Sequence, residues 1–329
     1  MMMKKNILIQ FAVMVAVILG MAVKPVEAAD YPTKTITIIN PYAPGGTLDI
    51  QARGFAMVAE KLLKQPVVVV NKAGATGMIG ATEGAKAAPD GYTLTVGSTS
   101  TVLPVAWEVV NGRTPSVTLQ DFVAIGSFTL SPTLVAVPYS SPWKTLADMV
   151  KDCRAKPDHF AFGSGGLYGG SHIPVELLMR AAGIRARHVP YKGGGPAVAA
   201  IVGGHVDFGC QFPPTCIPLY RGNKMRILAV QSNRRLKSIP EISTIRELGL
   251  DAEFYQWVGI WAPKGTPADV VKKLREVTAA ASKEKAFIDA VEKPGDEVIF
   301  MNGEELAKYT EREYEMFTKL LKELVKGKK

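Results

Sequence analysis

Cysteine and histidine are scarce in this sequence, and their scarcity excludes several classes of protein. Only three cysteines and four isolated histidines occur in 329 residues. Three thiols cannot build the framework of a disulfide-rich domain, and no spacing resembles that of a zinc site. We therefore predict that the protein binds no metal and no cofactor. Cys153, Cys210 and Cys216 are expected to be buried thiols, and a bridge between Cys210 and Cys216 is the alternative.

Motifs of catalysis are also missing. Phe162 stands two residues before Ser164, at the place where a G-x-S-x-G nucleophile elbow needs glycine. Gly74, Gly77 and Gly80 have the spacing G-x-x-G-x-x-G, which is not that of a dinucleotide-binding loop. The sequence has no P-loop and no cluster of acids with histidine or cysteine. We predict that the protein is not an enzyme, with an exported α/β oxidoreductase or hydrolase as the alternative.

Long apolar runs are missing after the N-terminal segment, which has the three parts of a secretory signal. Lys4 and Lys5 precede an almost wholly apolar run, residues 7–23, and small residues follow at Val26 and Ala28. We predict a signal peptide over residues 1–28, cleaved near Ala28 or residue 29, and a periplasmic location. An uncleaved anchor is the alternative, but the run is slightly short of the roughly 20 residues that span a bilayer.

The charge balance points away from nucleic acid. The formal net charge is +9, and residues 1–28 contribute +2 of it, from three lysines and one glutamate, which leaves about +7. The basic residues are scattered and are not interleaved with aromatic residues, so no nucleic-acid partner is predicted. A mild excess of positive charge would instead attract anionic solutes.

Short β-rich runs alternate with helical segments in two series, which predicts two α/β lobes. Such alternation is typical of parallel sheets with helices on both faces. The last predicted helix carries Phe317, Leu320, Leu321 and Leu324 on one face, so it is expected to pack on a core. The expected strands are residues 35–40, 67–71, 93–97, 134–138, 160–163, 187–190, 206–211, 227–231 and 254–261, and the expected helices are residues 47–63, 77–86, 144–156, 171–182, 197–202, 267–282 and 303–326.

Ligands in such sheets lie beyond the carboxyl ends of the strands, so the strand-to-helix loops are the candidate site. Residues 41–47 hold two adjacent glycines directly before a predicted helix. The unpaired N–H groups and positive dipole end of a helix start suit a carboxylate or phosphate. An ordinary turn, with Thr47 as N-cap and Asp49 in the first turn, is the alternative.

Two further loops have similar character. Residues 162–172 contain five glycines and two serines, and there Ser171 is expected to cap a helix and Ser164 to bond an anion. Residues 97–101 supply hydroxyl groups, either to a ligand or to helix capping. Together the first two loops, one in each lobe, predict a clamp for an anion.

Several segments, in order along the mature chain, resemble the solute-binding receptors of tripartite tricarboxylate transporters, the Bug proteins. Tyr31-Pro32 with Thr35-Ile36 resembles the opening of the family, and residues 41–49 carry its pattern P-[FY]-x-P-G-G-x-x-D. Two departures are a glycine-rich Tyr168-Gly169-Gly170 run and Gln211, where the family often has an acid. The resembling segments are residues 31–36, 41–49, 65–69, 71–75, 87–94, 189–194, 203–207 and 262–267.

The resemblance implies a type II periplasmic-binding-protein fold with a ligand cleft between two α/β lobes. Residues 30–130 would form the first segment of lobe 1, residues 131–250 lobe 2, and residues 251–329 the return to lobe 1 with the C-terminal helix. The implied function is capture of a small carboxylate, and its delivery by a monomer to the membrane permease subunits of such a transporter. A sensory binding protein with the same fold is a further alternative.

The resemblance and the loops together give the predicted ligand-binding residues. The family binds carboxylates through backbone N–H groups, hydroxyls and bridging waters, so Asp49 and Asp207 are expected to hold loops, although Asp207 could instead contact an amino group. The predicted residues are Tyr42, Ala43, Pro44, Gly45, Gly46, Thr47, Asp49, Ser98, Thr99, Ser100, Ser164, Gly165, Tyr168, Gly170, Ser171, His172, Tyr191, Asp207 and Gln211.

Overall fold

The computed structural model describes residues 31–326, so the predicted signal peptide, residues 1–28, lies outside the described residues. From Lys34 onward the described chain forms one compact unit. Among the helices that are described, none has the length and apolar character needed to span a membrane.

The first lobe is built on a six-stranded sheet in the order β11-β4-β10-β3-β1-β2. The strands β1, β2 and β3 pair in parallel, as predicted. The whole sheet is mixed, however, because β10 runs antiparallel to both β3 and β4, and β11 runs antiparallel to β4. The strands are β1 (Ile36–Asn40), β2 (Val67–Asn71), β3 (Thr93–Ser98), β4 (Phe122–Pro132), β10 (Tyr255–Pro263) and β11 (Val298–Asn302).

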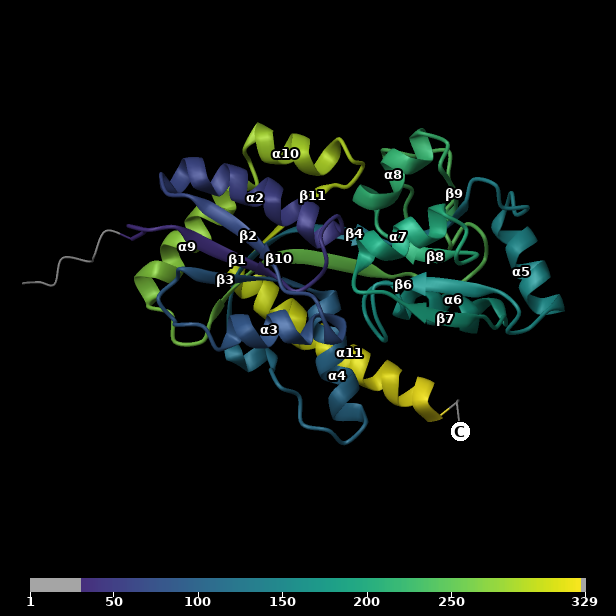
Figure 1. The fold of residues 1–329 in the computed structure, drawn as a ribbon, viewed down its shortest axis with the longest axis horizontal. Helices are drawn as coiled ribbons and strands as arrows, with labels where there is room; N and C mark the ends of the chain where they lie inside the picture. Colours follow the sequence, from purple (N-terminus) through teal and green to yellow (C-terminus); the bar gives the residue numbers. More distant parts are fainter. Residues whose placement is uncertain (1–30, 327–329) are drawn as a thin grey trace, which may run out of the picture. The chain divides into compact units, whose positions relative to one another are not determined.

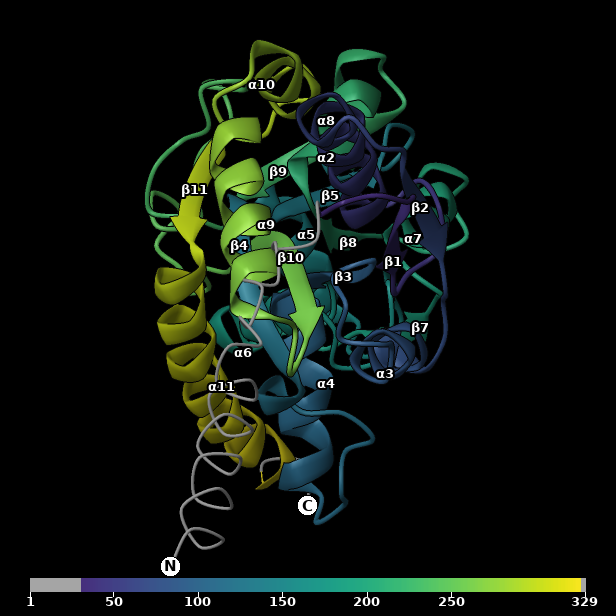
Figure 2. The same cartoon turned by 90° about the vertical axis from the view of Figure 1, so that its left-hand side faces the viewer.

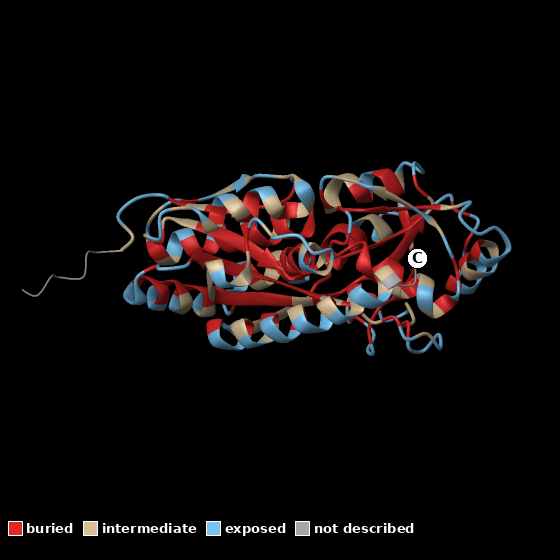
Figure 3. Ribbon diagram, turned by 90° about the horizontal axis from the view of Figure 1, so that it is seen from below, coloured by how far each residue is buried: buried red, intermediate tan, exposed pale blue. Residues whose placement is uncertain are grey.

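Helices cover both faces of this sheet, and the strands are mostly buried between them (Figure 3). On one face Phe128 of the sheet packs its ring against Phe55 and Phe287. On the other, α4 and α11 lie side by side and enclose Trp257 and Trp261 (Figures 1 and 2). The helices are α2 (Thr47–Leu63), α3 (Met78–Ala85), α4 (Thr99–Val110), α9 (Ala268–Ala281), α10 (Lys285–Glu292) and α11 (Gly303–Lys326), with short 3₁₀ turns η1 (Ala75–Gly77) and η2 (Leu119–Asp121).

The second lobe has a three-stranded sheet in the order β8-β5-β9 and a two-stranded parallel sheet, β6-β7. A parallel bridge between Phe162 and Phe208 joins the two. The three-stranded sheet is antiparallel, which corrects the expectation of a parallel sheet in this lobe. The elements are β5 (Leu134–Pro138), α5 (Leu146–Ala155), β6 (Ala161–Ser164), α6 (Ile173–Ala182), β7 (Arg187–Pro190), α7 (Gly194–Val202), β8 (Gly209–Gln211), α8 (Pro213–Arg221) and β9 (Met225–Val230).

The chain passes between the lobes at Thr133, between β4 and β5, and again between β9 and β10. Gln231, which is fully buried, joins these passages. Its Oε1 accepts a hydrogen bond from Thr133 Oγ1 at 2.8 Å, and its Nε2 donates to the carbonyl of Ala252 at 2.9 Å. The crossings are therefore fixed to each other by side-chain bonds as well as by backbone.

Five elements were not expected from the sequence: α4, β4, α8, α10 and β11. The helices α4 and α8 carry internal prolines, Pro104 and Pro218, which argue against helix when the sequence is read alone. Both helices are held by packing on their lobes. All three cysteines are free and buried, so the predicted thiols are present and the alternative bridge is not.

Candidate functional site

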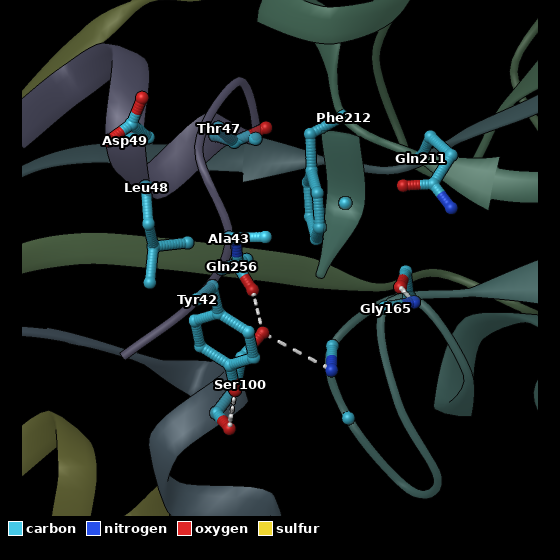
Figure 4. Close-up of a pocket in the computed structure, with 15 residues that line it drawn as sticks. Tyr42, Ala43, Thr47, Leu48, Asp49, Ser100, Gly165, Gln211, Phe212 and Gln256 are labelled. Atoms are coloured by element: carbon cyan, nitrogen blue, oxygen red, sulfur yellow. Dashed lines mark hydrogen bonds between the residues drawn. The ribbon is translucent and has the colours of Figure 1, made fainter. Parts of the chain in front are cut away.

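A cavity of about 40 Å³ lies where loops of the two lobes meet (Figure 4). Residues that follow β1, β3 and β6 contribute to it, as do residues next to β8 and on β10. The lining residues are Tyr42, Ala43, Gly46, Thr47, Leu48, Asp49, Ser100, Gly165, Gly169, Gly170, Ser171, Gly194, Gln211, Phe212 and Gln256.

The first-lobe loop is organised by one carboxylate. Asp49 accepts hydrogen bonds from the Gly45 N–H at 3.0 Å, from Arg53 Nε at 3.1 Å and from Asn71 Nδ2 at 2.9 Å. Burial opposes ionisation of this carboxyl, but the bonds from Arg53, Asn71 and Gly45 outweigh it and hold its pKa below the usual value. Asp49 lines the cavity and also holds the loop, which is the role that the sequence analysis expected.

This loop presents the start of α2 to the cavity. The N-cap is Gly46, with an extended backbone and no side-chain cap, so Thr47 is not the N-cap that the alternative interpretation gave it. The N–H groups of Gly46, Thr47 and Leu48 have no hydrogen-bond partner in the described part of the chain. The positive end of a 17-residue helix therefore opens on the cavity with three donors available.

A second helix start faces the first from the other lobe. A methyl group built on Gly46 would lie 3.5 Å from the Gly194 nitrogen and 3.4 Å from the Gly195 nitrogen, the first two residues of α7. These two N–H groups likewise have no partner among the described residues. The lobes also touch directly, since the Ala43 N–H donates to the carbonyl of Lys192 at 3.2 Å. Two helix N-termini thus converge on one small volume.

The predicted second-lobe loop, residues 162–172, uses most of its donors from Ser164 onward internally. Gly165 N–H donates to Ser171 Oγ at 2.8 Å and Gly166 N–H to Ser164 Oγ at 3.2 Å. Tyr168 N–H donates to His172 Nδ1 at 2.7 Å. Since Ser171 bonds to Gly165 and the N-cap of α6 is His172, the predicted capping by Ser171 is corrected. This loop shapes the cavity wall, and the open donors of the second lobe come from Gly194 and Gly195.

Three predicted residues of this loop lie behind the cavity wall. Ser164 Oγ lies 2.6 Å from His188 Nε2, and the rings of His172 and His188 stack with centroids 4.0 Å apart. Tyr168 stacks on Trp107 with centroids 3.7 Å apart. These side chains support the loop and do not line this cavity, and His172 lines a larger hollow of about 620 Å³ beside α6 and the end of α11.

The start of α4 supplies a hydroxyl from the first lobe. Ser98 caps the helix by accepting from the Ser100 N–H, so the capping alternative holds for Ser98. Pro104 has no N–H to bond the carbonyl of Ser100, and the Tyr42 hydroxyl donates to that carbonyl at 2.7 Å. Burial raises the pKa of Tyr42, which therefore stays a neutral donor. Ser100 Oγ itself accepts the Gly170 N–H of the second lobe at 3.2 Å.

A buried carboxyl supports this part of the cavity from behind. Glu313 on α11 accepts from Thr99 Oγ1 at 2.7 Å and from Trp257 Nε1 at 2.8 Å. Burial raises its pKa to about 8, despite these two bonds. Thr99 therefore bonds to Glu313 behind the cavity and does not line it. Ser100 follows Thr99 in the chain, and Gln256 precedes Trp257. Both Ser100 and Gln256 line the cavity.

The other predicted residues that do not line the cavity have local roles. Asp207 accepts the Ala161 N–H at 2.7 Å and so holds β6, which supports the loop-holding interpretation. Gly45 has a positive φ of 78° and turns the loop, next to Pro44. Tyr191 packs against the second-lobe core. Contact of these four residues with a ligand is not supported by their positions.

Five lining residues were missed: Leu48, Gly169, Gly194, Phe212 and Gln256. Gly194 lies in a segment that carried the family resemblance, so a signal was available for it. Leu48 could have been inferred from its place in the first turn of the predicted helix. Phe212 and Gln256 reach the cavity only through the packing of the lobes, and no local pattern marks them.

Comparison with known proteins places the chain in a family. A family model described as "Tripartite tricarboxylate transporter family receptor" matches residues 51–325. The chain belongs to this family. Protein BugT of Bordetella pertussis is 34% identical over 268 residues, which cover 81% of this chain and 82% of BugT. As a member of the tripartite tricarboxylate transporter receptors, the chain is a solute-binding receptor of the Bug type, and its relatives are binding proteins.

Solved structures agree with the fold. A periplasmic transporter structure is 35% identical, with a TM-score of 0.84, covering 89% of this chain and 97% of that one. MatC of Rhodopseudomonas palustris, with bound malate, is 27% identical with a TM-score of 0.81, covering 88% and 100%. An R. palustris protein with adipate is 28% identical with a TM-score of 0.82, covering 89% and 97%. The receptor has the two-lobed periplasmic-binding-protein fold that the sequence predicted.

Proposed function

We propose that this receptor captures a small carboxylate between its lobes and delivers it to the membrane permease subunits of a tripartite tricarboxylate-type transporter. The observation that carries the proposal is the convergence of two helix N-termini from different lobes, α2 and α7. Anions are stabilised at such ends by open N–H groups and by the helix dipole. The malate and adipate bound by two similar proteins are carboxylates, which supports the same solute class here.

The character of the lining favours a carboxylate over a cationic solute. Among the described lining residues, Asp49 is the only charged one, and its oxygens are already engaged by Arg53, Asn71 and Gly45. A bound cation would therefore find no available acid. An anion would find the N–H groups of both helix starts, and neutral donors of this kind suffice for a carboxylate.

The size of the cavity implies that binding is coupled to movement of the lobes. About 40 Å³ accommodates a few water molecules rather than an organic acid. The contacts that close it are few and polar, such as Ala43 to Lys192 and Gly170 to Ser100. We infer that the lobes lie apart in the solute-free protein in solution and that these contacts form around the bound solute, so that small-angle scattering should record a smaller radius of gyration at saturating solute.

The remaining parts of the proposal concern location and assembly. Export to the periplasm is supported by the similar structure of BugD, a periplasmic binding protein, and we propose that residues 1–28 are removed by cleavage near Ala28. N-terminal sequencing of the exported protein tests this, and a chain that still began at Met1 would contradict it. We further propose that the receptor acts as a monomer, that it catalyses no reaction, and that the lobes divide near residues 130 and 250.

Thermal unfolding with a panel of mono-, di- and tricarboxylates, together with amines of similar size, tests the solute class. A solute that binds only the folded state at a hundredfold excess over its Kd adds about 2.7 kcal/mol of stability. We expect shifts with acids and none with amines. The matched variant is Gly195→Ala, whose new methyl group would lie 2.6 Å from the carbonyl oxygen of Pro44 and so hold the lobes apart.

Loss of the shifts in Gly195→Ala, with a folded protein by circular dichroism, would support binding between the lobes. Gly222→Ala, at the end of α8 in the second lobe, is the control for the substitution itself, because its backbone φ of −86° suits alanine. A panel in which no acid stabilises the wild-type protein would contradict the carboxylate function.

A further inference from the structure

One buried polar atom of the cavity is left without a partner. Gln256 on β10 is fully buried and lines the cavity. Its Nε2 has no hydrogen-bond partner within the described part of the chain. Buried amide donors are nearly always satisfied, because an unpaired one is unfavourable in the protein interior. The position of Gln256 in the wall means that a bound solute can supply the missing acceptor.

The orientation of this amide is fixed by Ser100, which is itself bonded across the cleft. Ser100 Oγ accepts the Gly170 N–H at 3.2 Å, so its own proton is available to Gln256 Oε1, to which it donates. The amide oxygen is therefore occupied and the NH₂ group is the end that remains open. Figure 4 shows the two bonds in a row, from the second-lobe backbone through Ser100 to Gln256.

Both members of the Ser100–Gln256 pair are held from behind by the same carboxyl. Glu313 bonds to Thr99, the residue before Ser100, and to Trp257, the residue after Gln256. Each side chain of the pair thus stands next to an anchored residue. A donor held in this way loses little conformational freedom when it binds a solute, which is the condition for a specific contact.

We propose that Gln256 determines specificity by donating Nε2–H to an oxygen at the second end of the bound solute. This inference rests on the proposed function, in which the first carboxylate lies at the starts of α2 and α7. No cation lines the cavity among the described residues, so neutral donors must bind both ends. The solute class is therefore a carboxylic acid with a second oxygen-bearing group at its far end, preferred over an acid that ends in a methyl group.

Two matched pairs of acids test the assignment: succinate with butyrate, and adipate with hexanoate. Each pair has the same chain length and differs by the second carboxyl group. Titration calorimetry on the wild-type protein should give tighter binding of the two-ended member in at least one pair, by about 10-fold or more. Gln256→Met should remove most of this preference while binding of the one-ended acid is kept. Gln65→Met, outside the cavity and half-buried, is the control and should keep the preference.

Gln256→Glu is the second variant, because it keeps the size of the side chain and replaces the donor by an acceptor. It should weaken the two-ended acid more than the one-ended acid. A preference unchanged in both folded variants would overturn the inference, and so would equal weakening of both members of a pair, which would mean a structural role only. If the wild-type protein bound none of the four acids, the proposed carboxylate function would fail first, and this inference with it.

Discussion

The first lobe and the second lobe both send a glycine-rich strand-to-helix loop to the cavity, but these loops use their backbone N–H groups in different ways. In residues 41–47 a single carboxylate, Asp49, holds the loop by its Gly45 N–H and leaves the start of α2 open. In residues 164–172 the glycine N–H groups are bonded within the loop or to Ser100. Similar composition therefore produces a donor site in one lobe and a shaped wall in the other.

The supporting groups differ as well. On the first-lobe side the supporting groups are two carboxyls, Asp49 in the cavity wall and Glu313 behind it. Behind the second-lobe loop stand the hydroxyl of Ser164 and the stacked rings of His172 and His188. Carboxyl groups change their charge with pH and can hold several donors at once, whereas a hydroxyl contributes one or two neutral bonds. Substitutions on the first-lobe side should for this reason have larger effects.

The largest effect is expected for Gly46→Val. The backbone of Gly46 has a φ of −85°, which valine can adopt, so the fold should be kept. The branched side chain would stand against the nitrogens of Gly194 and Gly195, 3.4–3.5 Å from its Cβ, and fill the space between the helix starts. We expect a loss of affinity of at least about 100-fold by titration calorimetry. Unchanged affinity in a folded variant would mean that the solute binds elsewhere in the protein. Gly222→Ala at the end of α8 serves as the control.

The second effect is on stability and concerns Glu313. Its pKa is raised to about 8 by burial, so the unfolded chain loses this proton at lower pH than the folded one does. Stability should therefore be highest below the unfolded pKa and fall as the pH rises through about 8. Glu313→Gln mimics the protonated carboxyl, so the variant should lose less stability than the wild-type protein as the pH rises, by on the order of 3 kcal/mol. Asp296, whose pKa is raised to about 7, should contribute the same pH-dependent loss of stability in both proteins.

Urea unfolding at pH 5, 7 and 9 measures this difference. Equal slopes of stability against pH for the wild-type protein and Glu313→Gln would mean that Glu313 ionises normally in the fold. Gln256 and Ser100 should keep their positions in the variant at pH 5, so solute affinity at that pH is expected to change little.

The third prediction concerns Asp49→Asn, a substitution that should weaken the first-lobe loop directly. The amide keeps one acceptor but loses the ion pair with Arg53, whose Nη2 lies 3.0 Å from Asp49 Oδ1. We expect about a 10-fold loss of solute affinity and a stability loss of about 1–3 kcal/mol, because the Gly45 turn loosens. Asp90→Asn is the matched control, since its pair with Lys34 is exposed and should contribute less than about 1 kcal/mol. Equal effects of the two substitutions would contradict the special role of Asp49.

The smallest effect is expected for Ser164→Ala on the second-lobe side. The hydroxyl bonds to His188 and to Gly166 rather than to the cavity, so its removal should lower solute affinity only by about 2- to 10-fold. Calorimetry with the same acid as for Gly46→Val allows the direct comparison. A loss as large as that of Gly46→Val would show that both loops bind the solute equally, and the contrast between them would then be wrong.

Elements of the fold that depend on neighbouring residues could be predicted from the sequence, whereas elements that depend on residues far apart in the chain could not. The helix over residues 47–63 and the strand over residues 67–71 were predicted to the residue, because apolar spacing and β-branched runs act locally. The strand β4 was missed although it is the long neighbour of β10, since its sequence has no clear alternation and its pairing partners lie more than 100 residues away.

The sequence by itself determined the two-lobed α/β architecture, the family and the first strand-to-helix loop of the cavity, because periodicity, glycine pairs and helix starts are properties of neighbouring residues. Only the tertiary structure decided which loop of the second lobe offers donors. The N–H groups of residues 164–172 are engaged by side chains that fold back on them, and the open ones at Gly194 and Gly195 are brought opposite Gly46 by the approach of the lobes. It also decided that Gln256, on a strand with no local mark of function, stands in the cavity with an unpaired amide, since that depends on contacts with Ser100 156 residues away.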